Sequence, residues 1–185
     1  MNALIVIDVQ QSFLHRPYFR DEELPAFLAK LQSLIDRCRR REIPVLQIFH
    51  QDESQGPSGA FSRHSGWVAT LPQLDIDPAA VFYKQVHSAM FGRSSTGETL
   101  EQWLRAHGVE HVIVSGIRTE QCCETTARHA YDLGFEVTYA IDATLTFPMT
   151  TRAGRSVSTA ELREHTELVL ADRFAKVMPA EAVSI

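Results

Sequence analysis

The sequence predicts an α/β fold in which a doubly wound, mostly parallel sheet of six strands carries helices on both faces. Short runs of consecutive apolar residues, such as ALIVI at 3–7, suit strands that are buried on both faces of a sheet. Segments with apolar residues at helical spacing separate these runs along the whole chain. This alternation of strand and helix is typical of doubly wound folds.

The first 108 residues of the chain provide three of the predicted strands and two predicted helices. After the strand at 3–7, residues 23–41 carry apolar side chains at helical spacing, and Pro44 stops that helix. The runs VLQIF at 45–49 and AVFYK at 80–84 predict the second and third strands. TLEQWLRAH at 99–107 predicts a helix that Gly108 closes.

The C-terminal half continues the same pattern. HVIVS at 111–115 predicts a fourth strand, and a helix is expected from Thr119 to Gly134. EVTYAI at 136–141 predicts a fifth strand. Residues 158–172 form a predicted helix that opens with a serine and a glutamate at the spacing of a capping box, and AKVMP at 175–179 predicts the last strand.

Length and composition bound the class of protein. The 185 residues suffice for one domain, 1–185, with a sizeable core. The net charge is −5, with the charges interspersed, which speaks against a nucleic-acid or membrane partner. The N-terminal apolar run lacks a basic flank and is cut short by Asp8, so we expect neither a signal peptide nor a membrane span.

The three cysteines indicate a reducing compartment. Cys122 and Cys123 are neighbours in the chain, and neighbours rarely form a disulfide without strain. Cys38 lies on the apolar stripe of the first predicted helix and is expected in the core. A chain without a disulfide framework fits the cytoplasm.

Three chemically capable side chains fall at one edge of the predicted sheet. Doubly wound folds bind ligands outside the carboxyl ends of their strands, where the strand order reverses. Asp8 follows the first strand, Lys84 ends the third, and Cys122 lies just beyond the fourth. Each alone has a structural explanation, as a strand-end carboxylate, a surface lysine or a small buried side chain. Their convergence favours a catalytic site.

The position of Cys122 suits a nucleophile. With Thr119 as the N-cap, Cys122 is the third residue of its helix, where free N–H groups and the helix dipole favour a thiolate and should lower the pKa of Cys122. Asp8 could take the thiol proton, and Lys84 could stabilise negative charge. Cys123 should point elsewhere on the helix and pack in the core.

Three segments of the chain resemble the signature segments of the isochorismatase-like cysteine hydrolases, a superfamily that includes nicotinamidases, N-carbamoylsarcosine amidase and isochorismatase. They are LIVIDVQQSF, VFYKQVHSAMFG and VIVSGIRTEQCCETTARHAYDLGFEVTYAIDA. The third is the most specific, and its matching positions are Gly116, Thr119, Cys122, Thr125, Ala130, Gly134 and Asp142. The resemblance runs from residue 3 to about residue 145.

This resemblance implies a role for each residue of the constellation. Asp8 would be the general base, Lys84 the charged helper and Cys122 the nucleophile. A cis peptide would join Ile117 to Arg118, so that the backbone N–H groups of Arg118 and Cys122 form an oxyanion hole. Cys123 falls where relatives commonly carry valine, which supports its assignment to the core. Family members usually form dimers or larger homo-oligomers.

One departure from the family concerns metal binding. Nicotinamidases carry an Asp-x-His pair and a further histidine after the second strand, and these residues bind a metal. Here His50, Asp52 and His64 are present without the Asp-x-His spacing. They could ligate zinc, or they could be ordinary loop residues, with His50 contacting substrate. We expect no metal and no cofactor.

Other residues are candidates for the walls of the pocket. Arg118 stands where relatives often carry a small residue, so its guanidinium could bind a carboxylate or could point into solvent. Phe13, Trp67, Phe91 and Phe147 are possible apolar walls, although each could simply belong to the core. The segment 147–159 is long and polar, and it could form a lid over the pocket or a contact with another subunit.

The sequence therefore predicts a cysteine-dependent hydrolase of a small amide, ureide or carbamoyl compound. Cys122 argues against hydrolysis of a vinyl ether, because isochorismatases with that activity typically lack the cysteine. The alternatives are a metal-dependent nicotinamidase and a catalytically silent binding module on the same scaffold. A redox pair of Cys122 and Cys123 is disfavoured, since the two side chains should diverge on a helix. The expected partners are a small-molecule substrate and further copies of the chain.

Overall fold

The computed structural model covers residues 1–185 and contains the predicted parallel sheet of six strands. In chain order the strands are β1 (Asn2–Ile7), β2 (Val45–His50), β3 (Ala80–Lys84), β4 (His111–Ile117), β5 (Glu136–Leu145) and β8 (Lys176–Met178). Their order across the sheet is β3-β2-β1-β4-β5-β8, and every neighbouring pair is parallel. The strand order therefore reverses between β1 and β4, which is where a doubly wound fold binds its ligand.

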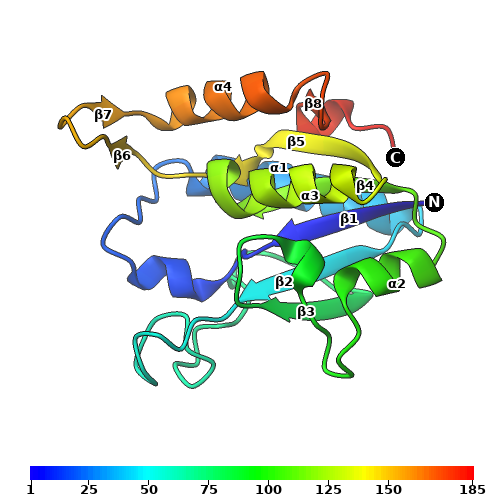
Figure 1. Ribbon diagram of the computed structural model, residues 1–185, viewed down its shortest axis with the longest axis horizontal. Helices are drawn as coiled ribbons and strands as arrows, with labels where there is room; N and C mark the ends of the chain where they lie inside the picture. The colour runs from blue at the N-terminus through cyan, green and yellow to red at the C-terminus, as the bar shows by residue number, and fades with distance from the viewer.

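Helices cover both faces of this sheet (Figure 1). They are α1 (Leu24–Arg40), α2 (Leu100–Ala106), α3 (Glu124–Asp132) and α4 (Thr159–Leu170). Short helical turns precede or follow them, namely η1 (Gln11–His15), η2 (Ala89–Phe91), η3 (Thr119–Cys123) and η4 (Ala180–Ala182). None of the helices is both long enough and apolar enough to cross a membrane.

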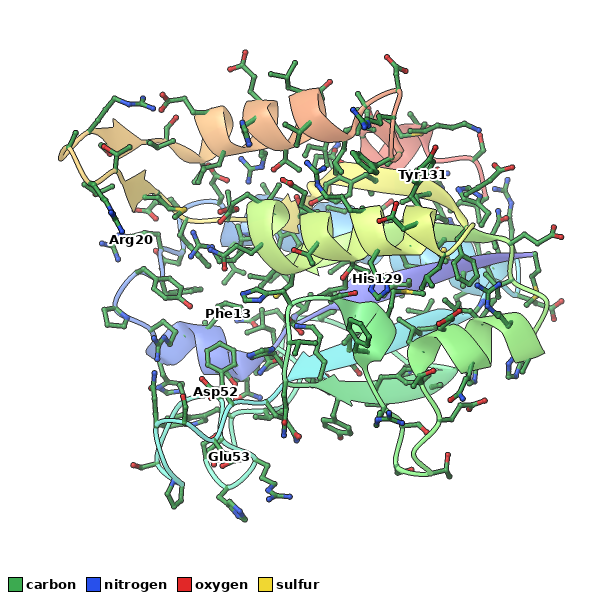
Figure 2. The ribbon with its side chains drawn as sticks, viewed as in Figure 1. Phe13, Arg20, Asp52, Glu53, His129 and Tyr131 are labelled. Carbon is green, nitrogen blue, oxygen red and sulfur yellow. The ribbon has the colours of Figure 1, made fainter.

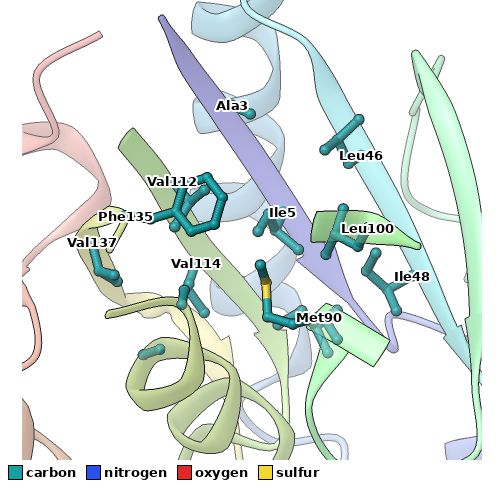
Figure 3. Close-up of a cluster of buried hydrophobic side chains, with 14 of the residues drawn as sticks. Ala3, Ile5, Leu46, Ile48, Met90, Leu100, Val112, Val114, Phe135 and Val137 are labelled. Carbon is teal, nitrogen blue, oxygen red and sulfur yellow. The ribbon is translucent and has the colours of Figure 1, made fainter. Parts of the chain in front are cut away.

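Both faces of the central strands are buried, which explains why their sequences are continuous apolar runs. In β1, Ala3, Ile5 and Ile7 pack in one core cluster with residues of α2 and α3. Leu4 and Val6 pack in a second cluster on the other face, with residues of α1. Figure 3 shows part of the first cluster, in which β1, β2 and β4 contribute alternate residues. Cys38 and Cys123 are both fully buried in these clusters, as expected.

The ends of the elements follow local signals. Ser158 caps α4 in a capping box with Glu161, as the sequence predicts, and Thr99 does the same for α2 with Gln102. The strands β4 and β5 run beyond their predicted ends at 115 and 141. The hairpin of β6 (Met149–Thr150) and β7 (Ser156–Val157) was not predicted, and it lies within the polar segment 147–159.

Candidate active site

Asp8, Lys84 and Cys122 meet at the carboxyl end of the sheet. Asp8 follows β1, Lys84 is the last residue of β3, and Cys122 lies in η3 directly after β4. The Nζ atom of Lys84 lies 2.7 Å from Oδ2 of Asp8 and 3.4 Å from Sγ of Cys122. The structure thus brings together the three side chains that the strand ends predicted.

The backbone around Asp8 is fixed by a close approach of β1 and β4. Gly116 pairs with Ile7 in the sheet, and a Cβ atom on Gly116 would lie 2.0 Å from the carbonyl oxygen of Ile7. Only glycine fits such an approach. Asp8, which follows Ile7 in the chain, has a φ of 54°. This value lies in the left-handed region, which aspartate tolerates better than most residues. This turn takes the chain out of β1 at the point where β4 leads into η3.

The turn that carries Cys122 differs from the prediction. Residues 119–123 form a π-helical turn, and α3 begins only at Glu124. Thr119 is not the N-cap, because its hydroxyl is paired with that of Thr144 at 2.8 Å. Arg118 occupies the cap position, without a side-chain cap. Cys122 is therefore not the third residue of an α-helix.

The peptide bond between Ile117 and Arg118 is cis, as the resemblance implied. Beyond it, the carbonyl oxygen of Arg118 accepts hydrogen bonds from the N–H groups of Gln121 and Cys123, both at 3.2 Å. The hydroxyl of Thr126 donates to the carbonyl oxygen of Cys122 at 2.6 Å. These contacts hold the turn of Cys122 to its own backbone at Arg118 and to α3 through Thr126.

The electrostatic environment of Cys122 is the reverse of the one expected. Burial, together with the negative charge of Asp8, raises the pKa of the Cys122 thiol to about 12, although Lys84 opposes the shift. The expectation of a lowered pKa was therefore wrong, because it assumed an exposed α-helix N-terminus instead of a buried turn beside a carboxylate. The resting site holds a thiol next to an ion pair.

Lys84 remains charged in this site. Burial alone would lower the pKa of Lys84, but the adjacent Asp8 and Cys122 outweigh it and leave the pKa above its usual value. One oxygen of Asp8, Oδ2, accepts from Lys84, whereas Oδ1 is buried without any hydrogen-bond partner in the protein. Oδ1 is therefore the atom that is free to receive a proton.

His50 completes the polar cluster. Its Nδ1 atom lies 3.2 Å from Nζ of Lys84. An ammonium group can only donate, so Nδ1 is the acceptor and the ring proton is on Nε2. Burial and the charge of Lys84 both lower the pKa of His50, which favours this neutral form. His50 thus has one N–H group that is not used by Lys84.

Asp8 and Cys122 open onto a cavity of about 180 Å³. Larger hollows lie elsewhere, of about 800 Å³ at the start of β5 and about 680 Å³ outside β3, and they contain neither Asp8 nor Cys122. Figure 2 shows two wall residues of the small cavity, Phe13 and Asp52, beyond the carboxyl ends of the strands. Its walls are formed by Asp8, Phe13, Arg16, Tyr18, His50, Asp52, Gln55, Phe61, His87, Gln121 and Cys122.

Of the apolar walls proposed from the sequence, Phe13 lines this cavity, and so does His50. Trp67 does not, because its ring stacks on His15 at a centroid distance of 3.5 Å. Phe91 is 61% exposed and lies beside His129, outside the cavity. Both were proposed as aromatic residues that could form apolar walls, and the direction in which such a side chain points cannot be read from composition.

The side chain of Arg118 also does not reach the cavity wall. It is buried and paired with Glu120 at 2.9 Å, and its Nη2 donates to the carbonyl oxygen of Phe147 at 3.4 Å. Neither expectation for this guanidinium, a contact with a substrate carboxylate at the pocket wall or exposure to solvent, matches that position. Tyr18 separates it from the cavity, since the Arg118 guanidinium carbon lies 5.1 Å from the Tyr18 ring centroid and Tyr18 lines the cavity.

Sequence reasoning missed several wall residues, among them Arg16, Tyr18 and Phe61. Arg16 and Tyr18 belong to the loop after β1, and Phe61 belongs to the loop after β2. One signal could have found them, because loops that leave strands beside the reversal of strand order border the ligand site. Which of their side chains turn inward depends on the folded loop.

The residues considered for a metal do not form a metal site. No group of three or more histidine, cysteine, aspartate or glutamate side chains is arranged to hold a metal ion. His50 and Asp52 line the cavity, but His64 does not. The donor Nδ1 of His50 is already engaged by Lys84. This donor set does not fit the metal-dependent alternative.

Comparison with known proteins agrees with the observed fold. The isochorismatase domain model matches residues 2–182. Nicotinamidase 3 of Arabidopsis thaliana is 30% identical over 97% of this chain and 85% of its own length. The nicotinamidase/pyrazinamidase of Mycobacterium tuberculosis is 29% identical over 78% of this chain and 86% of its own. A solved structure of an isochorismatase from Pseudomonas putida superposes with a TM-score of 0.81 at 25% identity, covering 99% of this chain and 90% of that one.

Proposed function

Because the chain belongs to the isochorismatase family, we propose that it is a cysteine-dependent amidohydrolase that cleaves a small amide, ureide or carbamoyl C–N bond. The two curated relatives named above are amidases, which supports an amide substrate. The observation that carries the proposal is the contact of Lys84 with Asp8 and Cys122, two residues that line the same small cavity. A hydrolase of this kind needs a nucleophile, a base and a fixed cation, and the proposal assigns these roles to Cys122, Asp8 and Lys84.

In the first half of the proposed reaction, Cys122 attacks the carbonyl carbon of the substrate. Since the resting thiol holds its proton, the S–H proton passes to Oδ1 of Asp8 as the S–C bond forms. The carbonyl oxygen becomes an oxyanion, which the backbone N–H groups of Arg118 and Cys122 would stabilise. The C–N bond then breaks, Asp8 returns the proton to the departing nitrogen, and ammonia or an amine leaves a thioester on Cys122.

In the second half, Asp8 takes a proton from a water molecule, and the resulting hydroxide attacks the thioester. The C–S bond breaks, the carboxylic acid is released, and the thiolate recovers its proton from Asp8. Lys84 stays protonated throughout. Its role is to hold the Asp8 carboxylate in place and to offset the negative charge that moves between Asp8, sulfur and the substrate oxygen.

Ammonia release from a panel of primary amides, ureides and carbamoyl compounds tests this proposal. Cys122→Ala should abolish turnover, and incubation of the wild type with substrate followed by acid quenching should add the acyl mass to the peptide that contains Cys122. Cys123→Val serves as the matched control, because Cys123 is fully buried in the core and should tolerate a small apolar residue. Turnover that survives in Cys122→Ala would refute the mechanism.

We propose further that the protein works in the cytoplasm as a homodimer or larger homo-oligomer, as the resemblance implies. The exposed β6–β7 hairpin offers a place for such a contact, since Met149 is 39% exposed at its start. Light scattering of the wild type and of Met149→Asp tests this assignment. A subunit contact at the hairpin predicts a smaller particle for the variant, and an unchanged mass rules this contact out.

A further inference from the structure

Arg16 presents a cation without an acidic partner to the cavity that contains Cys122. It lines that cavity, and none of the ion pairs of the chain includes it. Its one side-chain hydrogen bond runs from Nη1 to Oε1 of Gln55, a neutral amide, at 3.2 Å. Its Nε is buried and has no hydrogen-bond partner in the protein. The guanidinium therefore has N–H donors that no acceptor of the protein occupies, and an acceptor that enters the cavity can use them.

Aromatic rings support this guanidinium. Its central carbon lies 5.5 Å from the ring centroid of Tyr18 and 6.0 Å from that of Phe61. Contacts of this kind limit the orientations of an arginine side chain and leave the N–H edge available for a planar acceptor. The ring of Tyr18 also contacts the guanidinium of Arg118, which is paired with Glu120. From the sequence, Arg118 was a candidate for a carboxylate contact or an exposed side chain, whereas in the structure it is Arg16 that lines the cavity.

The other charges around the cavity leave this cation available. The negative charge of Asp8 is matched by Lys84 in a direct ion pair. Asp52 is the remaining carboxylate on the wall, and its Oδ1 accepts a hydrogen bond from the N–H of Ser54 at 2.9 Å. Hydrogen bonds from Ser54 lower the pKa of Asp52, with smaller contributions from His50 and Arg16. Asp52 is thus a neighbour within electrostatic range of Arg16 but forms no ion pair with it.

We propose that Arg16 binds a carboxylate of the substrate, so that the compound hydrolysed is a small carboxylic acid that carries an amide or carbamoyl group at its other end. This inference rests on the proposed function and narrows its substrate class. A cavity of about 180 Å³ has room for about six water molecules, which suits a short acid. Hydrolysis of a primary amide of this class consumes one water and yields ammonia and a dicarboxylate.

Matched substrates with and without the carboxylate test the proposal. The probes are succinamate and N-carbamoylglycine, each compared with its methyl ester. The wild type should favour the free acid in kcat/KM by at least tenfold. Arg16→Met should reduce that ratio to about one by lowering the value for the acid and leaving that for the ester. Arg16→Lys should retain part of the preference, because it keeps the charge but loses the planar fork.

Arg20→Met is the matched control. Arg20 lies in the same loop, but it is exposed, donates to the carbonyl oxygens of Pro17 and Phe19, and does not line the cavity. Figure 2 shows it away from Phe13 and Asp52. The ratio of acid to ester should be unchanged in this variant. Equal rates for acid and ester in the wild type, or an equal loss of both in Arg16→Met, would overturn the proposal.

A binding measurement separates this inference from the proposed function. Succinate should slow the alkylation of Cys122 by iodoacetamide in the wild type and in Arg20→Met, but not in Arg16→Met. Protection without turnover of any probe would leave the carboxylate site standing while the assigned reaction fails. Absence of protection by succinate would refute the carboxylate site, even if neutral amides are hydrolysed.

Discussion

Gly116 lies so close to Ile7 that a Cβ atom on it would be 2.0 Å from the carbonyl oxygen and 2.6 Å from the nitrogen of Ile7. This contact joins the two central strands at the last pair of their register. The residue after Ile7 is Asp8, and the residues after Gly116 lead into the turn that carries Cys122. One glycine thus sets the approach of the carboxylate to the thiol.

Gly116→Ala should therefore destabilise the protein and remove its activity. Backbone cannot move aside as a flexible side chain can, so the strands would have to separate at the active site, and we expect a loss of at least about 3 kcal/mol in the free energy of unfolding. Gly108→Ala is the control. Its φ of 63° is also positive, but a Cβ atom there meets nothing within 4 Å. Urea unfolding should show a loss of only about 1–2 kcal/mol for it.

Because Lys84 and Asp8 form an ion pair, the effect of replacing one of them on the free energy of unfolding should depend on whether the other is present. Their side chains are 0% and 1% exposed, so removal of one leaves the other as an uncompensated buried charge. Lys84→Met should lower the free energy of unfolding by about 3–5 kcal/mol. The double variant Asp8→Asn with Lys84→Met should lose less than the sum of the single variants. Strict additivity in urea unfolding would mean that the two side chains do not interact.

Replacement of Asp8 by asparagine should raise the rate at which Cys122 is alkylated but lower the rate of turnover. Below its pKa of about 12, the thiolate fraction of Cys122 rises about tenfold per pH unit, and the alkylation rate should rise with it. Because the charge of Asp8 raises this pKa, Asp8→Asn should speed alkylation at pH 9. Lys84→Met should slow alkylation, since the charge of Lys84 lowers the pKa. Turnover, which needs the base, should fall by about 10²–10⁴-fold in Asp8→Asn.

Peptide mass spectrometry at several pH values measures these alkylation rates, and Cys38 of the same protein serves as the internal control. Cys38 is fully buried, and burial raises its pKa to about 11, so it should react slowly at every pH in all variants. A slower alkylation of Cys122 in Asp8→Asn would contradict the electrostatic picture of the site. It would then be Asp8 that keeps the thiol reactive in the resting enzyme.

The strands and the trio were predictable from the sequence because each rests on a local pattern. The apolar runs of β1 and β4 are continuous since both faces of the sheet are covered, and the residues that follow them must emerge at one edge. Asp8, Lys84 and Cys122 were found by that rule. The resemblance added the cis bond at Ile117–Arg118, which no property of the residues alone suggests.

The features of the site that the sequence did not predict depend on contacts between residues that are distant in the chain. Thr119 has the chemistry of an N-cap, but Thr144 on β5 takes its hydroxyl, and the turn becomes π-helical. The raised pKa of Cys122 follows from burial that only the folded site defines. Arg16 and Arg118 are both arginines near the site, and their sequence neighbours do not reveal which one pairs with Glu120. Long-range packing decides that.

The side chain of Arg118 should stabilise the fold, whereas that of Arg16 should determine substrate specificity. Arg118 and Glu120 have side chains that are only 9% and 10% exposed, so Arg118→Met leaves a buried carboxylate without its cation. We expect a loss of about 3–5 kcal/mol in the free energy of unfolding. Addition of Glu120→Gln should recover part of that loss, because the amide removes the unpaired charge and can still accept a hydrogen bond from Thr146.

Arg118→Met should leave the preference for the acid over its methyl ester intact, at a temperature where the variant is folded. The side chain of Arg118 contacts the cavity only through the ring of Tyr18, and its backbone N–H is unchanged in this variant, whereas the side chain of Arg16 lines the cavity itself. The two substitutions should therefore have different effects. Arg118→Met should lower the stability, and Arg16→Met should remove the preference for the acid. If Arg118→Met instead erases the preference and leaves urea unfolding unchanged, the carboxylate contact belongs to Arg118, and Tyr18 must move aside when substrate binds.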